Sequence, residues 1–228
     1  EEKAIVAKLI FPCIVCHMKC KLFVEERIED FLCSNFSGLD FVFSIFPGEL
    51  SLTQELKEPV VSRELCRLSK ENSFILFFHF VAVVDDKKYL SVMVVDNGRI
   101  LGISDSVTTK EYCVSQRQRI YMTSKLKTGI IVDEDIFHTD SVGCLYQNKA
   151  DAIVFMTAKH FSDKFFKAFC SHKFFHDIPI IAAFANKICF FNSSFHLGDK
   201  GQKYDYKILP AKQPKIQKIK LKSPSFEY

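Results

Sequence analysis

Residues 129–136 read GIIVDEDI, an apolar run that stops at three consecutive carboxylates. The hydrophobic pattern predicts a strand over Thr128–Val132, a helix over Ile136–Lys149 and a second strand over Ala150–Met156. A strand, a crossover helix and a second strand form the unit from which parallel sheets are built. The carboxylates occupy the first turn of this unit, which makes that turn a candidate active centre.

Strands and helices alternate in both directions from this unit, with strand pairs that meander between them. The apolar patterns predict strands at Ala4–Val15, Phe41–Phe46, Ser73–Val84, Tyr89–Val95, Arg99–Ser104, Pro179–Phe184 and Lys187–Phe191, and helices at Lys21–Ser34, Glu58–Asn72 and Ser162–His172. Pro47-Gly48 is expected to stop one strand, and Asn97-Gly98 is a strong hairpin signal. This order predicts an α/β fold in which two mostly β layers are covered by helices.

The charge distribution separates a body from a tail. The chain has 228 residues and a formal net charge of +4. Five lysines against one glutamate lie in residues 211–228, so residues 1–210 are expected to form one near-neutral α/β domain. A Lys- and Pro-rich tail is expected to be extended or docked on a partner. Because a nucleic-acid protein normally carries a basic face on its fold, no nucleic-acid partner is expected.

Cysteine usage indicates a reduced compartment. There are nine cysteines, an odd number, and several lie among apolar neighbours, where a thiol behaves as a small hydrophobic group. Free thiols in the cytoplasm therefore fit the sequence better than a disulfide framework. No signal peptide is visible and no run approaches the roughly 18 to 20 apolar residues that span a bilayer, so no membrane partner is expected.

Five local signatures, in this order and spacing, resemble the nitrilase superfamily of carbon–nitrogen hydrolases. They are Phe41–Phe46 followed by PGELSLT at 47–53, the hairpin Tyr89–Gly102, the elbow Gly129–Ile136, the strand Lys149–Val154, and the closing segments Ile180–Asn186, Asn192–Ser194 and Gly198–Gly201. The resemblance covers residues 4–209 as element order. It implies a four-layer α-β-β-α sandwich, a homodimer, a small amide-like ligand and no cofactor.

The family chemistry uses a cysteine nucleophile, a glutamate base and a lysine that steadies the oxyanion. The resemblance places the base at Glu49, with Gly48 inserted in the usual Pro-Glu pair, and the lysine at Ser106, which carries no charge. It places the nucleophile at Asp133, where a carboxylate would form only an acyl anhydride. Lys110 and Cys113 are the nearby residues that could replace the missing groups.

Three other clusters resemble metal sites. Cys13-x-x-Cys16-His17-x-x-Cys20 crowds four ligand types into one segment, whereas zinc sites usually close with a second pair from elsewhere. The acidic turn, together with Asp140, has the ligand chemistry of Mg²⁺ but lacks a phosphate-cradling loop. His172 and His176 are four residues apart. We favour packing or structural roles for all three clusters, and Asp135 is interpreted as an acid that braces the elbow.

Three functional hypotheses follow from these residues. The favoured one is a nitrilase-like protein that lacks the usual thiol chemistry and binds a small molecule or a partner. The second is an active hydrolase of non-peptide carbon–nitrogen bonds with altered catalytic groups. The third is a metal-binding protein built on the Cys13–Cys20 cluster.

Overall fold

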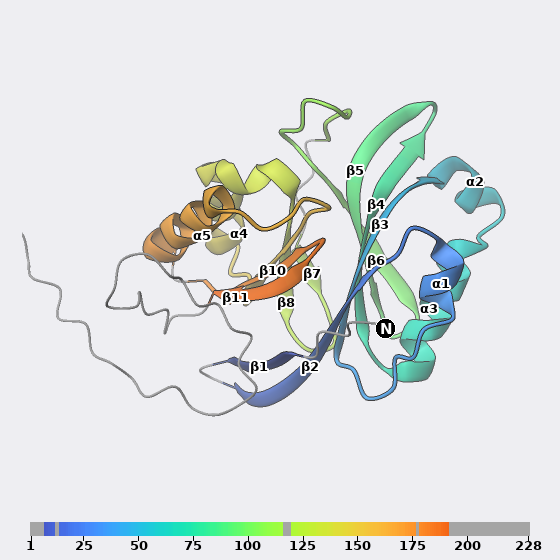
Figure 1. The fold of residues 1–228 in the computed structure, drawn as a ribbon, viewed down its shortest axis with the longest axis horizontal. Helices are drawn as coiled ribbons and strands as arrows, with labels where there is room; N and C mark the ends of the chain where they lie inside the picture. The colour runs from blue at the N-terminus through green and yellow to red at the C-terminus, as the bar shows by residue number, and fades with distance from the viewer. Residues whose placement is uncertain (1–6, 12–13, 116–119, 177, 192–228) are drawn as a thin grey trace, which may run out of the picture.

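The computed structural model describes residues 7–11, 14–115, 120–176 and 178–191, with side chains from residue 19 onward except 173 and 174. Two sheets face each other, and helices lie on the outer side of each (Figure 1). The predicted closing segments 192–194 and 198–201, and the tail 211–228, lie outside the described residues. No helix in the described part of the chain is long and apolar enough to cross a bilayer.

The first sheet has six strands in the order β1-β2-β3-β4-β5-β6. These strands are β1 (Ala7–Phe11), β2 (Ile14–Val24), β3 (Phe41–Ser51), β4 (Ile75–Val84), β5 (Lys87–Asp96) and β6 (Arg99–Asp105). Strands β2, β3 and β4 run parallel, while β5 and β6 return antiparallel through tight turns. The helices that accompany this sheet are α1 (Ile28–Leu32), α2 (Leu52–Lys57) and α3 (Val61–Asn72).

The second sheet has five strands in the order β11-β10-β9-β8-β7. These strands are β7 (Ile120–Met122), β8 (Lys127–Val132), β9 (Ala152–Met156), β10 (Ile180–Phe184) and β11 (Lys187–Phe191). Strands β8, β9 and β10 are parallel, as the sequence pattern predicts for strands joined by crossover helices. The helical segments of this half are η1 (Asp133–Phe137), α4 (Thr139–Gln147) and α5 (Asp163–His176).

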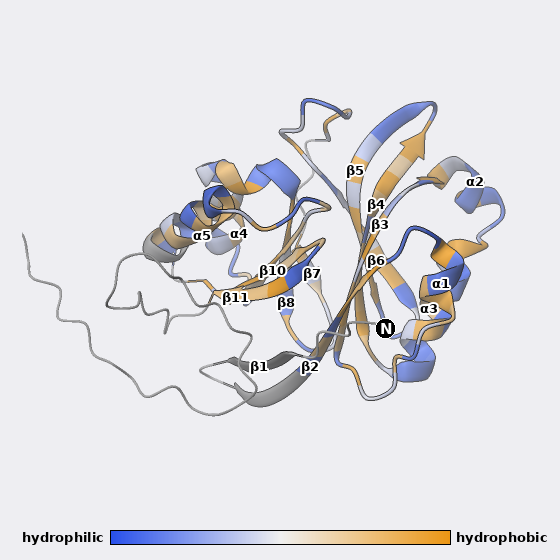
Figure 2. Cartoon of the chain, viewed as in Figure 1, coloured by the Kyte–Doolittle hydropathy of each residue, from blue (hydrophilic) through white to orange (hydrophobic). Residues whose placement is uncertain are grey.

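Three apolar layers hold the sandwich together. Residues such as Phe43, Val92 and Val132 pack between the sheets. A second cluster lies between the second sheet and α4 and α5, and a third lies between the first sheet and its helices. Figure 2 shows the hydrophobic residues concentrated in the strands and the hydrophilic residues on the helices and the β4–β5 hairpin tip. The predicted α-β-β-α sandwich is confirmed.

The prediction of a helix over Lys21–Ser34 is wrong in its first part. Lys21–Val24 completes β2, which pairs in parallel with β3, and the helix is confined to α1. Leu22 packs into the core between the sheets, whereas Phe23 packs on the opposite face. The strand signal is present in the sequence, because polar and apolar residues alternate from His17 to Leu22, but the apolar residues and acids that follow favoured a helix.

The end predicted for β3 is also wrong. Pro47-Gly48 does not stop the strand, which continues to Ser51 through a bulge. Four positions separate Ile45 from Glu49 on β3, while their partners on β4, His79 and Val81, are two positions apart. The bulge therefore adds two residues to β3.

Candidate functional site

The elbow is the turn in which β8 ends and η1 begins, and Asp133 is its first residue. Asp133 has a φ of 49°, in the left-handed region that non-glycine residues seldom adopt. Strain of this kind clusters at functional sites. The Asp133 side chain is directed inward and only 5% of the residue is exposed. The geometry places a buried carboxylate where the family resemblance places a nucleophile.

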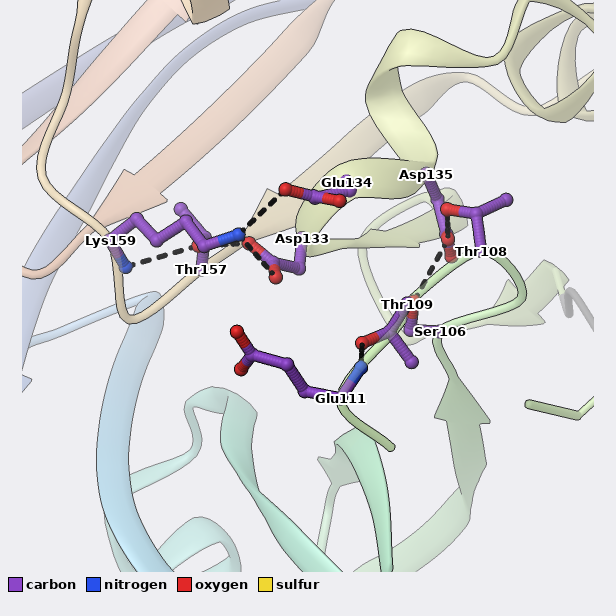
Figure 3. A network of polar contacts seen from close by, with 9 residues as sticks. All are labelled: Ser106, Thr108, Thr109, Glu111, Asp133, Glu134, Asp135, Thr157 and Lys159. Carbon is purple, nitrogen blue, oxygen red and sulfur yellow. Dashed lines mark hydrogen bonds and ion pairs between the residues drawn. The ribbon is translucent and has the colours of Figure 1, made fainter. Parts of the chain in front are cut away.

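Two residues that follow β9 hold the Asp133 carboxylate. The Thr157 hydroxyl donates to Oδ1 at 2.7 Å, and the Lys159 ammonium lies 3.0 Å from Oδ2. The same ammonium lies 3.0 Å from Glu134 Oε1, so one lysine bridges two acids (Figure 3). Although desolvation alone would lower it, hydrogen bonds to Asp133 and Glu134 raise the pKa of Lys159. The lysine stays charged and offsets one of the two negative charges that it bridges.

Asp135 has a different role at the opposite side of the turn. It is buried, and it accepts hydrogen bonds from Ser106 Oγ (2.9 Å) and Thr108 Oγ1 (2.6 Å) (Figure 3). The Val107 amide also donates to it, at 3.0 Å. Burial raises the pKa of Asp135, and the hydrogen bonds from Thr108, Val107 and Ser106 offset this only in part. Asp135 therefore joins the elbow to the loop after β6, as expected of a bracing acid.

Ser106, at the predicted lysine position, is fully buried and bonded to Asp135. Its backbone amide donates to the Leu90 carbonyl, which continues the β5–β6 ladder and places Ser106 beside the elbow. A hydroxyl in this place braces the turn but supplies no positive charge. The assignment of this position to the family's lysine stays a prediction, and the residue found there is a buried serine.

Glu49, at the predicted base position, pairs with Val81 of β4, whose side chain faces the second sheet. Because paired neighbours point to the same face, Glu49 also faces the second sheet, despite the inserted residues. Its carboxylate forms an ion pair with the ammonium of Lys88 on β5. Both side chains are about half exposed, at 52% and 51%. Glu49 thus lies at the solvent-facing margin of the site, already paired.

The two candidate replacement residues lie in the loop after β6, and both are exposed. The Cys113 amide donates to the Lys88 carbonyl at 2.8 Å, which fixes the loop backbone next to the Glu49–Lys88 pair. Lys110 adds to the lowering of the Glu134 pKa, which is caused mainly by the hydrogen bond from Lys159 and its charge. Cys113 is therefore held next to Glu49 and Lys88, whereas the charge of Lys110 acts on Glu134 in the elbow.

Sequence reasoning missed Lys88, Thr157 and Lys159. Thr157 and Lys159 directly follow a predicted strand that runs parallel to β8, and the carboxyl ends of parallel neighbours meet at one edge. That rule could have identified them. Lys88 carried no such signal, because it lies in the polar turn of a hairpin, where lysines are ordinary surface residues.

Two of the three clusters that resemble metal sites in the sequence, the acidic turn and the histidine pair, lie within the described residues. Within the described ranges, no three His, Cys, Asp or Glu side chains gather as a metal site. Asp133 and Asp135 turn to different partners, and Asp140 is exposed. The helix that was expected to end near His172 continues to His176, so the two histidines share it, but His172 Nε2 contacts the Ile136 carbonyl oxygen at 2.5 Å.

Cys13 lies outside the described residues, as do the side chains of Cys16 and His17. The cluster that they would form with Cys20 stays a prediction. Elemental analysis of the purified protein would test it, because a zinc or iron site would give stoichiometric metal.

No family model matches the chain, and no curated protein matches it. Among solved structures, the carbon–nitrogen hydrolase of Helicobacter pylori G27 is 13% identical, with a TM-score of 0.52 over 64% of this chain and 61% of that one. Nit3 of Saccharomyces cerevisiae, a member of branch 10 of the nitrilase superfamily, is 13% identical, with a TM-score of 0.51 over 64% and 62%. The chain thus spans about three fifths of these two proteins.

A cysteine-to-alanine mutant of the Nesterenkonia AN1 amidase, in complex with butyramide, is 11% identical, with a TM-score of 0.57 over 74% of this chain and 76% of that one. At such identities the likeness shows the fold. The chain has the fold of the nitrilase superfamily, in a form whose sequence has diverged far from the solved structures. The resemblance drawn from the sequence is confirmed at this level.

Proposed function

We propose that this protein binds a small amide-like molecule at the elbow and does not carry out thiol-dependent hydrolysis. The observation that carries the proposal is the buried Asp133 carboxylate at the nucleophile position, ion-paired with Lys159. A carboxylate that attacks an amide yields an acyl anhydride, with little driving force. Pairing with an ammonium lowers its nucleophilicity further.

The state of the other two catalytic positions supports the proposal. Ser106 is committed to Asp135 and has no charge with which to stabilise an oxyanion. Glu49 is ion-paired with Lys88, which leaves it poorly placed as a free base. The solved Nesterenkonia amidase that holds butyramide has this fold, and we take an amide as the ligand class by analogy.

An ammonia-release assay tests the absence of hydrolysis. We expect acetamide and butyramide to release no more ammonia with the wild-type protein than with buffer. Turnover that Glu49→Ala abolishes would overturn the proposal and support the alternative, an active hydrolase of non-peptide carbon–nitrogen bonds with altered groups. Turnover that Glu49→Ala leaves unchanged would identify a contaminating amidase, because a nitrilase-type reaction needs its base.

A homodimer and a cytoplasmic setting complete the proposal. Seven cysteines in the described part of the chain are free thiols, and two of these, Cys20 and Cys189, are buried. This supports a reducing compartment. Thiol titration of the denatured protein without reductant is expected to find all nine cysteines of the sequence free. Light scattering is expected to give twice the mass of one chain.

A further inference from the structure

His79 is a buried histidine whose ring has no hydrogen-bond partner. It lies on β4, paired with Ile45 of β3 and Val92 of β5. Both of those neighbours pack between the sheets, so the His79 side chain also faces the second sheet. It is 1% exposed, and neither ring nitrogen has a partner among the described residues.

His79 lies close enough to the elbow for the charge of Asp133 to act on its ring. In the register of the first sheet, it is one same-face position deeper than Val81, which pairs with Glu49. From the facing sheet, Val132 packs into the same apolar layer, and Asp133 follows it. Burial lowers the pKa of His79 to about 4, and the negative charge of Asp133 opposes this shift. The imidazole is therefore neutral at neutral pH and lies within the field of the elbow carboxylate.

The His79 imidazole and the Asp133 carboxylate can each form further hydrogen bonds, and their donors and acceptors are complementary. A neutral imidazole offers one N–H donor and one nitrogen acceptor. Each Asp133 oxygen receives one bond, from Thr157 or Lys159, and a carboxylate oxygen can accept a second. An unsatisfied buried polar group destabilises the folded protein, and a ligand that bonds to the unpartnered His79 ring would remove that penalty.

Charge limits what that ligand can be. An anion would meet Asp133 and Glu134 at the elbow and Glu49 at the margin. A cation would have to displace Lys159, which two acids already hold. An uncharged molecule with a donor and an acceptor side by side satisfies both Asp133 and His79 without either cost.

We propose that His79 and Asp133, one from each sheet, form the two ends of a binding site for a small uncharged molecule that donates a hydrogen bond to Asp133 and accepts one from His79. The inference deepens the proposed function and rests on it. It assigns His79 as the residue that selects a neutral carbonyl-bearing ligand. Because His79 is buried, the entry route that this proposal requires lies beside the half-exposed Lys159 side chain, which is ion-paired with Asp133.

Nuclear magnetic resonance of the His79 ring tests the proposal directly. Wild-type protein is titrated with acetamide, acetate and methylammonium, three probes of similar size that differ in charge. The His79 resonances are assigned by their loss in His79→Asn. We expect acetamide to shift the His79 ring nitrogens with saturation, and acetate and methylammonium to leave them unchanged. No shift with acetamide, or an equal shift with acetate, would overturn the proposal.

Calorimetry with variants provides a second measurement. His79→Leu is expected to weaken acetamide binding by at least roughly tenfold, about 1.4 kcal/mol. Thr128→Val is the matched control, because Thr128 is also fully buried with an unpartnered side-chain oxygen but is the second residue of β8, near the end opposite Asp133. This control is expected to bind as wild type does. Should His79→Leu fail to fold, His79→Asn replaces it and is expected to retain part of the affinity.

The outcomes separate this inference from the proposed function. Unchanged acetamide affinity in His79→Leu would overturn the role of His79 while leaving a non-hydrolysing amide-binding protein intact. Ammonia release that depends on Glu49 would overturn the proposed function, whatever His79 does.

Discussion

Asp133 and Asp135 belong to one turn, two residues apart, yet their surroundings are opposite. Asp135 faces the loop after β6 and receives bonds from neutral donors, which tie the elbow to the first sheet. Asp133 faces the end of β9 and is neutralised by Lys159. The architecture of the elbow is thus maintained by one acid, while the other lies at the position that the family resemblance assigns to the nucleophile. A fold can retain the first arrangement and change the second, because the two draw on separate partners.

Removal of the Asp135 carboxylate is expected to have the largest effect on stability. Asp135→Ala leaves the Ser106 hydroxyl and the Val107 amide without their acceptor, in a part of the structure that is largely buried. Bonds to a charged acceptor are worth about 1.5–3 kcal/mol each, and partial relaxation reduces the sum. We expect a loss of about 3 kcal/mol in the free energy of unfolding, measured by urea denaturation.

Asp140→Ala is the control for that measurement, because Asp140 is an exposed acid in the next helix. It is expected to change stability by less than about 0.5 kcal/mol. Equal losses in the two variants would mean that Asp135 does not brace the elbow.

Removal of the counter-charge is expected to have a smaller effect. Lys159→Ala leaves the Asp133 carboxylate buried with only the Thr157 hydroxyl as partner. Because the Lys159 side chain is 47% exposed, solvent screening limits the loss to about 1 kcal/mol. Adding Asp133→Asn to Lys159→Ala should recover stability in a double-mutant cycle. A double variant as unstable as the sum of the single ones would indicate that the two residues do not interact.

The direction in which stability changes with pH tests the raised pKa of Asp135. The pKa of Asp135 is raised in the folded protein, so the folded state binds this proton more tightly than the unfolded chain. Its favourable contribution is complete below the unfolded pKa of about 4, and it is lost as the pH rises through the raised folded pKa. The stability of the wild type minus that of Asp135→Asn should therefore fall as the pH is raised from about 4 toward neutrality. A difference that rises with pH would contradict this assignment.

The smallest effect on stability is expected from the loss of the Glu49–Lys88 ion pair. Lys88→Ala removes the ion pair with Glu49, in which both side chains are about half exposed. Exposed pairs contribute about 0–1 kcal/mol, so we expect a change below about 0.5 kcal/mol, reduced further in about 0.5 M salt. A loss of stability as large as that of Lys159→Ala would contradict the half-exposed setting of this ion pair.

The elbow could be predicted from sequence because its information is contiguous. The apolar strand, the acids and the following helix lie within one short stretch, and periodicity reveals each. The partners could not be predicted in the same way. Lys88 meets Glu49 only through sheet register, over a separation of 39 residues. His79 stands in an apolar run and reads as a core position, since nothing local indicates that its ring lacks a partner.

The bulge in β3 has a consequence for how this protein can change in length. Side chains alternate between faces at every residue of a strand, so only the parity of an insertion matters to the face on which Glu49 lies. Two extra residues keep Glu49 toward the second sheet, whereas one would turn it toward the helices. Insertions or deletions of an even number of residues at 46–48 are therefore expected to keep the direction of Glu49, whereas odd numbers reverse it. Deletion of one residue there should harm the site more than deletion of two.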